Sequence, residues 1–135
     1  MKLIDTNVFI YAVGAPHEYK EVCARLAKEF IEGQHDVNIN TELLQEVLFH
    51  FWHRKRRAEA FGVFDSIMTG FPNPIPITGR EVQAAREIME TYPNLQPRDA
   101  IHAAVVLEHG LEGIISTDRG FDELKGIARF DPKDL

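Results

Sequence analysis

The chain has 135 residues, of which 44% are hydrophobic and 27% are charged, so it is expected to form one globular domain spanning residues 1–135. Its formal net charge of −6 argues against broad, nonspecific binding of nucleic acid, although a local basic patch would still allow RNA to dock. No apolar run reaches the about 20 residues of a transmembrane helix, and a single cysteine, Cys23, excludes an internal disulfide and suits a reducing cytoplasm.

Short apolar runs alternate along the chain with longer amphipathic segments. In chain order, the expected elements are a strand at 2–5, a short helix beginning at 8–12, a helix at 16–31, a strand at 36–40, a helix from 41 into the basic stretch before 57, a helix at 57–69, a loop at 71–76, a helix from 78 to about 93, a helix at 97–110, a strand at 113–117, a helical turn at 119–124 and a strand at 127–130.

Several of these boundaries rest on residues that favour helix starts. Pro16 and Pro97 suit first helical positions, and Thr41 is expected to cap the third helix. Thr78 and Glu81 have the spacing of a capping box. Because the strands are separated by helices, right-handed crossovers are expected, and the sequence predicts an α/β fold with a mainly parallel central sheet.

Four carboxylates lie near the starts or ends of predicted core elements. Asp5 and Asp118 each close an apolar run, whereas Glu46 and Asp99 fall in the first turns of helices. Strand C-termini and helix N-termini share one edge of an open α/β sheet, where ligands bind. Four acids on that edge would repel one another, and a hard divalent cation such as Mg²⁺ or Mn²⁺ would relieve the repulsion. Metal-assisted hydrolysis of a phosphodiester is the chemistry that such a site suits best.

The same acids lie in stretches that resemble the motifs of one nuclease family. Residues 3–12 are similar to the first motif of PIN-domain nucleases, residues 98–104 to the third acidic motif and residues 116–122 to the fourth, and Glu46 stands where the family keeps its second acid. In size, the chain resembles the VapC toxins of toxin–antitoxin pairs. The resemblance implies a three-layer α/β/α fold, a Mg²⁺- or Mn²⁺-dependent endoribonuclease activity, a homodimer and a small antitoxin partner.

The resemblance also implies how the site residues divide their work. Asp5, Asp99 and Asp118 would coordinate the ion, and Glu46 would help to orient or deprotonate the attacking water. Many relatives carry a further Asp where this chain has Gly120, and Asp122 is the candidate that could serve instead. The polar residues beside these acids are candidates to hydrogen-bond them or to hold a metal-bound water; they are Thr6, Asn7, Ser116 and Thr117.

Other interpretations of these residues stay open at this point. Asp5 could simply cap the following helix, and an acid at Asp99 is favoured by the helix dipole without any ion. His102 lies on the same helical face as Asp99 and could touch the site, although a satisfied core histidine is the more common case. A PIN-like module that binds RNA or protein without cleaving is the alternative function, and the four intact acids argue against it.

One segment of the chain, residues 49–57, is both aromatic and basic. Arg54, Lys55, Arg56 and Arg57 could contact RNA phosphates, or they could surround a dimer face that carries Trp52. Stacking of Trp52 on unpaired bases and a merely solvated helix end are the remaining interpretations.

Overall fold

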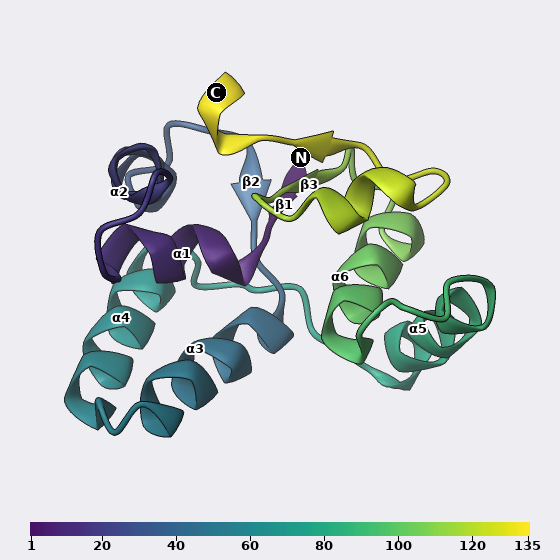
Figure 1. Cartoon of the computed structure of the whole chain (residues 1–135), viewed down its shortest axis with the longest axis horizontal. Helices are drawn as coiled ribbons and strands as arrows, with labels where there is room; N and C mark the ends of the chain where they lie inside the picture. The colour runs from purple at the N-terminus through teal and green to yellow at the C-terminus, as the bar shows by residue number, and fades with distance from the viewer.

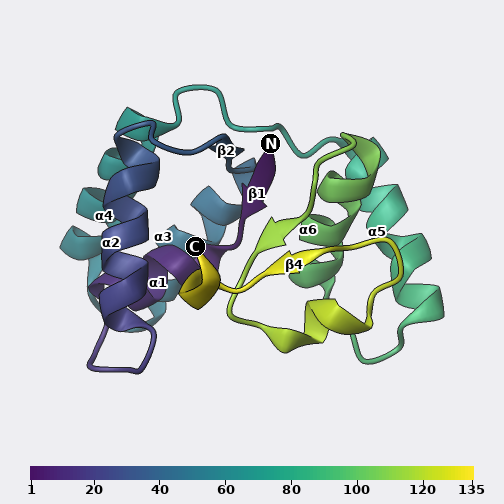
Figure 2. The ribbon, with the colours of Figure 1, turned by 90° about the horizontal axis from the view of Figure 1, so that it is seen from above.

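Four short parallel strands lie between two groups of helices in the computed structural model, which describes residues 1–135 (Figure 1). The elements in chain order are β1 (Lys2–Ile4), α1 (Thr6–Val13), α2 (Lys20–Ile31), β2 (Val37–Asn38), α3 (Thr41–His53), α4 (Arg57–Gly70), α5 (Gly79–Thr91), α6 (Pro97–Glu108), β3 (Ile114–Ile115), the 3-10 helix η1 (Arg119–Glu123), β4 (Arg129–Phe130) and the 3-10 helix η2 (Pro132–Asp134). Helices α1 to α4 cover one face of the sheet, and α5 and α6 cover the other (Figure 2). The predicted three-layer α/β/α architecture is therefore confirmed.

The strand order is β2-β1-β3-β4, and all three pairings are parallel. Leu3 is in register with Asn38 on one side and with Ile114 on the other. The first strand of the chain, β1, is therefore a central strand of the sheet. All four strands point the same way, and their C-terminal ends therefore share one edge of the sheet.

Alternating side chains of the two central strands build a separate core on each face of the sheet. Ile4 and Ile115 pack with the helices α1 to α4, in a core that also contains the large buried rings Phe30 and Phe51. Leu3 and Ile114 point the other way and pack with residues of α6 and of the C-terminal segment. Because successive strand residues face opposite sides, a strand buried on both faces needs an unbroken apolar run, as this sequence has.

Two expected helix starts are wrong. The helix expected from Pro16 begins at Lys20, because His17 turns back to accept a hydrogen bond from the Tyr19 backbone at 3.2 Å and its ring stacks on Tyr11 at 4.4 Å. The cap of α3 is Asn40 and not Thr41: the Asn40 side chain accepts from the Leu43 backbone N–H at 3.0 Å.

The remaining sequence signals agree with the structure more closely. The Thr78–Glu81 capping box is present at the start of α5, and Pro97 is the first residue of α6. The strands expected at 36–40, 113–117 and 127–130 exist but are only two residues long. No helix of the protein combines the length and apolar character needed to cross a membrane.

Candidate active site

A polar cleft of about 360 Å³ opens at the C-terminal edge of the sheet, where β1 and β3 meet the first turns of α1 and α6. All four acids singled out in the sequence lie in its wall. The complete lining is Asp5, Asn7, Ile10, Glu46, Phe49, His50, Arg54, Gln96, Arg98, Asp99 and Asp118. The fold thus brings together acids from four segments that are up to 113 positions apart in sequence, from 5 to 118.

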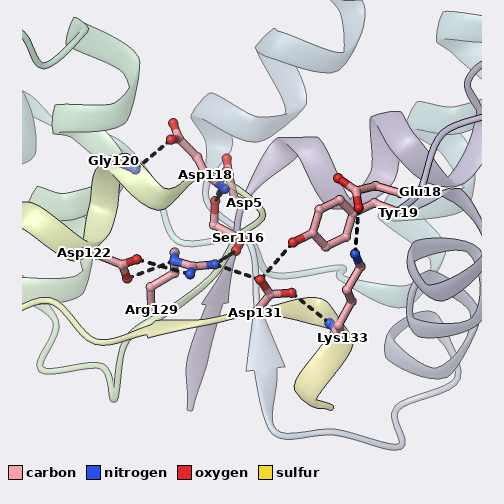
Figure 3. Close-up of polar contacts among 10 residues, drawn as sticks. All are labelled: Asp5, Glu18, Tyr19, Ser116, Asp118, Gly120, Asp122, Arg129, Asp131 and Lys133. Atoms are coloured by element: carbon pink, nitrogen blue, oxygen red, sulfur yellow. Dashed lines mark hydrogen bonds and ion pairs between the residues drawn. The ribbon is translucent and has the colours of Figure 1, made fainter.

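Asp5 leaves the end of β1 and is only 3% exposed. It is the N-cap residue of α1, yet its carboxylate makes no capping hydrogen bond, so the capping interpretation fails. Its Oδ2 atom instead accepts a hydrogen bond from the Ser116 hydroxyl at 2.6 Å (Figure 3). Burial raises the pKa of Asp5, while the nearby His102 and the Ser116 hydrogen bond act in the opposite direction.

Glu46 is held in place by a histidine from the facing helix. The Nε2 atom of His102 lies 2.9 Å from Oε1 of Glu46 and 3.8 Å from Oδ1 of Asp5. His102 is fully buried, so it is both a satisfied core histidine and a neighbour of two of the acids. Burial lowers the pKa of His102, but the hydrogen bond to Glu46 and the charge of Asp5 more than offset this and raise it.

Asp99 lies in the first turn of α6 and is half-buried, and its carboxylate accepts no hydrogen bond and forms no ion pair within the protein. Burial, followed by repulsion from Asp5 and Asp118, raises the pKa of Asp99 to about 6. The acids of the cleft therefore interact electrostatically even though no three acidic or histidine side chains form a ready-made ligand cluster. A carboxylate that lacks a protein partner and is repelled by its neighbours is well suited to bind a cation.

Asp118 follows β3 and caps the short helix η1. Its Oδ1 atom accepts from the Gly120 backbone N–H at 2.8 Å (Figure 3). A Cβ atom at position 120 would lie 3.1 Å from that same Oδ1 atom. At Gly120, where the chain departs from the family pattern, the backbone therefore approaches the carboxylate of Asp118 closely.

Asp122 does not line the cleft. Its two carboxylate oxygens face Arg129, at 2.9 Å from Nε and 3.2 Å from Nη2 (Figure 3). Arg129 also donates to the Ser116 carbonyl at 2.9 Å and to Asp131 at 3.2 Å. A carboxylate that is engaged by both sides of a guanidinium is not available as a further ligand, so the interpretation of Asp122 as a substitute for the missing acid is corrected.

The four polar neighbours of the acids differ in what they touch. Ser116 is fully buried and links the two strand ends, since its hydroxyl donates to Asp5 and accepts from the Asp118 backbone N–H at 2.9 Å. Asn7 lines the cleft. The hydroxyl of Thr6 is buried beside Asp5 without a hydrogen-bond partner. Thr117 is half-buried, and its side chain makes no hydrogen bond within the protein.

The basic residues at the end of α3 lie in different environments. Arg54 lines the cleft and lies 3.0 Å from Nδ1 of His50. Arg56 forms an ion pair with Glu59 and lies over the Phe51 ring, so its charge is already used inside the protein. Arg57 lies over the Phe61 ring, and Lys55 occupies a left-handed turn with φ of 58°.

The aromatic side chains of the same segment remain on the surface. Trp52 is 64% exposed and Phe49 is 48% exposed, and Phe49 also lines the cleft. The Phe49 ring stacks on His53 with the centroids 5.7 Å apart.

Two contributors to the site, Arg98 and Asn40, are not among the residues predicted from the sequence. Arg98 lines the cleft directly beside Asp99, and its place next to an acidic motif was the available signal. Asn40 is fully buried and lies 2.9 Å from Nδ1 of His102. No pattern along the chain relates Asn40 to His102, because the two residues are 62 positions apart.

Comparison with known proteins agrees with this arrangement. The family model for the PIN domain matches residues 2–127. The chain is similar to VapC ribonuclease Mb1869c of Mycobacterium bovis and to ribonuclease VapC13 of Mycobacterium tuberculosis, each at 36% identity over 96% of this chain and 98% of the relative. Ribonuclease VapC7 of M. tuberculosis is 26% identical over 98% of this chain and 92% of the relative.

Two solved structures share the fold. The crystal structure of FitAcB from Neisseria gonorrhoeae aligns over 100% of both chains with a TM-score of 0.74 and 22% identity. That of VapBC2 from Rickettsia felis, bound to a DNA fragment from their promoter, aligns over 96% of both chains with a TM-score of 0.73 and 11% identity.

Proposed function

Since the chain belongs to the PIN-domain family, we propose that it is a metal-dependent endoribonuclease and the toxin of a VapBC-type toxin–antitoxin pair, acting in the cytoplasm. The observation that carries this proposal is the convergence of Asp5, Glu46, Asp99 and Asp118 in one cleft at the C-terminal edge of the sheet. The similarity to proteins named VapC ribonucleases, which extends over nearly the whole chain, supports the same activity.

Asp5, Asp99 and Asp118 are the residues that would hold Mg²⁺ or Mn²⁺. Their oxygen donors suit a hard divalent ion, and the raised pKa of Asp99 reflects crowding of negative charge that such an ion would relieve. The buried Thr6 hydroxyl, which has no protein partner, stands directly beside Asp5. When bound, the ion would stabilise the negative charge that develops on the phosphate and lower the pKa of a bound water.

The side chains of the cleft then have distinct tasks. Glu46 would orient or deprotonate the attacking water, from a position that its hydrogen bond to His102 fixes. Ser116 would fix the position of the Asp5 carboxylate relative to the Asp118 backbone, because one hydroxyl contacts both. No serine or cysteine nucleophile is required.

Arg54 and Arg98 are the cations available to RNA phosphates inside the cleft. Guanidinium groups bind phosphate well, and they would let an acidic protein accept a polyanion locally. Phe49 adds an exposed ring to the same wall, which an unpaired base could stack on. These contacts favour single-stranded over duplex RNA as the substrate.

Two protein partners belong to this proposal. A small antitoxin would inhibit the enzyme, in keeping with the VapBC2 name of a structure that shares the fold. A second copy of the chain would pack through the surface around Trp52, whose large exposed ring is typical of an interface. The cations of the 54–57 segment that stay outside the cleft would then lie at the rim.

A cleavage assay on single-stranded RNA tests the activity. Wild-type protein should cleave in Mg²⁺ or Mn²⁺ and stop when the ion is chelated, and Asp5→Asn and Asp99→Asn should remain folded and inactive, since an amide keeps the size but loses the charge. Asp65→Asn, at an exposed acid outside the cleft, is the matched control and should cleave normally. Wild-type rates in both site variants would refute the site, and a folded wild-type protein without any metal-dependent cleavage would favour the non-cleaving module.

A further inference from the structure

Two buried polar side chains, Asn40 and His102, form a continuous hydrogen-bonded chain with Glu46 between α3 and α6 at the acidic cleft. Asn40 and His102 are both fully buried, and the chain ends on Glu46, whose side chain is 11% exposed. Nδ2 of Asn40 lies 2.9 Å from Nδ1 of His102, and Nε2 of His102 lies 2.9 Å from Oε1 of Glu46. Buried polar groups of this kind are stable only when every donor meets an acceptor.

The orientation of the Asn40 amide is decided by its other contact. The Leu43 backbone N–H points at Oδ1 of Asn40 at 3.0 Å, because Asn40 caps α3. A backbone N–H can only donate, so the amide oxygen must face it. The amide NH₂ group therefore faces His102, and the helix cap and the histidine contact use opposite ends of one side chain.

The Asn40 amide also decides which nitrogen of the His102 imidazole carries the proton. An amide NH₂ group can only donate, so Nδ1 of His102 must carry a lone pair. A neutral imidazole then has its proton on Nε2, where it donates to Glu46. A proton on Nδ1 would place two donors 2.9 Å apart in a site without water access.

We propose that Asn40 is a positioning residue of the nuclease site: by donating to Nδ1 it holds His102 in the Nε2–H tautomer, and His102 thereby fixes the carboxylate of Glu46. This inference rests on the proposed function, in which Glu46 acts on the attacking water. The hydrogen bond occupies Oε1 and leaves the second oxygen of Glu46 free to work in the cleft. Residues that orient the groups around a metal site typically change metal affinity or activity about 10- to 100-fold when replaced.

Asn40→Asp separates this role from helix capping. An aspartate keeps an oxygen for the Leu43 N–H and is as good an N-cap as asparagine. Toward His102, however, it replaces a donor with an acceptor, which draws the ring proton to Nδ1. Either Nε2 then faces the Glu46 carboxylate with a lone pair, or the ring keeps the Nε2 proton as an imidazolium and adds a positive charge beside the acids. The neutral Nε2–H tautomer is lost in both cases.

The first readout does not need activity. At a pH above the raised pKa of His102, where the imidazole is neutral, nitrogen-15 NMR of the metal-free wild-type protein should show His102 protonated on Nε2 and not on Nδ1. The signal is assigned by its loss in His102→Gln. In Asn40→Asp the proton should appear on Nδ1. A wild-type His102 that carries its proton on Nδ1 would overturn the inference whatever the protein cleaves.

The second readout is kinetic. Asn40→Asp should lower kcat for single-stranded RNA about 10- to 100-fold while KM stays unchanged, since the RNA-binding wall is intact. Thr78→Ala removes the cap of α5 at a residue that does not line the cleft, and it should reduce stability without lowering kcat. Unchanged kcat in a folded Asn40→Asp protein would overturn the inference, whereas an inactive wild type would overturn the proposed function instead.

A second pair of variants decides the matter if Asn40→Asp does not fold. The amide of His102→Gln can accept from Asn40 with its oxygen and donate to Glu46 with its nitrogen, whereas His102→Leu can do neither. His102→Gln should therefore keep at least tenfold more kcat than His102→Leu. Equal losses in the two variants would show that His102 contributes packing alone.

Discussion

The charge of Asp99 should destabilise the metal-free protein, and Asp99→Asn should therefore stabilise it. The carboxylate is half-buried, has no hydrogen-bond donor from the protein and is repelled by Asp5 and Asp118. An asparagine at this position keeps nearly the same volume and removes the repulsion. Asp99→Asn should raise the melting temperature while abolishing cleavage, which is the behaviour expected of a residue selected for function at a cost in stability.

The size of the effect follows from the pKa of Asp99, which is raised from 3.8 to about 6. A shift of about two units corresponds to about 3 kcal/mol, and partial exposure of the side chain reduces this to about 1–2 kcal/mol. Below pH 4 the folded and unfolded states are both protonated and the group contributes nothing. Between pH 4 and 6 the unfolded chain loses the proton first, so wild-type stability falls as the pH rises, and above pH 6 the full penalty applies.

Thermal unfolding in chelator at pH 4, 5, 6 and 7 measures this dependence. At pH 7 Asp99→Asn should melt about 4–8 °C above the wild type, and the gap should close toward pH 4, given about 4 °C per kcal/mol for a chain of this size. Asp65→Asn, at an exposed acid outside the cleft, should follow the wild-type curve. An Asp99→Asn variant that is less stable than the wild type at pH 7, or that keeps the same gap at pH 4, would refute the electrostatic argument.

Three further predictions concern ligands and assembly. Mn²⁺ at a hundredfold excess over its Kd should stabilise the wild type by about 2.7 kcal/mol in thermal unfolding, and the gain should shrink in Asp118→Asn; a flat response would contradict the clustered acids. Arg54→Ala and Arg98→Ala should each reduce the salt dependence of RNA binding by about 0.7 in log–log slope, whereas Arg56→Ala, already paired within the protein, should leave it unchanged. Trp52→Ala should convert a dimer into a monomer in sedimentation experiments, and a monomeric wild type would exclude that face as the interface.

The sequence predicts the fold best where one residue type decides the local structure. Leu3 and Ile4 are both apolar because β1 is buried on two faces, and the Thr78–Glu81 box caps α5 as its spacing indicates. The error at Pro16 has a tertiary cause. Proline tolerates a first helical position, but stacking of the Tyr11 and His17 rings holds the chain in a turn and delays the helix to Lys20.

The candidate site was predictable in its acids and not in what surrounds them. Asp5 and Asp118 could be placed at one edge because parallel strands end there, which needs only the alternation of strands and helices. The partners of those acids depend on side-chain directions across the sheet. Pairing of Asp122 with Arg129, and of Asn40 with His102, joins residues whose spacing along the chain carries no information about their contact.

The hydrogen bond between Ser116 and Asp5 has a consequence for the order in which the site forms during synthesis. The first acid is made almost at once, but β3, the second neighbour of β1, begins only at Ile114, and the Ser116 hydroxyl that holds Asp5 comes 111 positions after it. Chains generally fold from the N-terminus during synthesis, and contacts between distant segments form last. A nascent chain that has not reached Ser116 therefore lacks both the hydroxyl that holds Asp5 and the fourth acid, Asp118, so the acidic cleft is completed only near the end of translation.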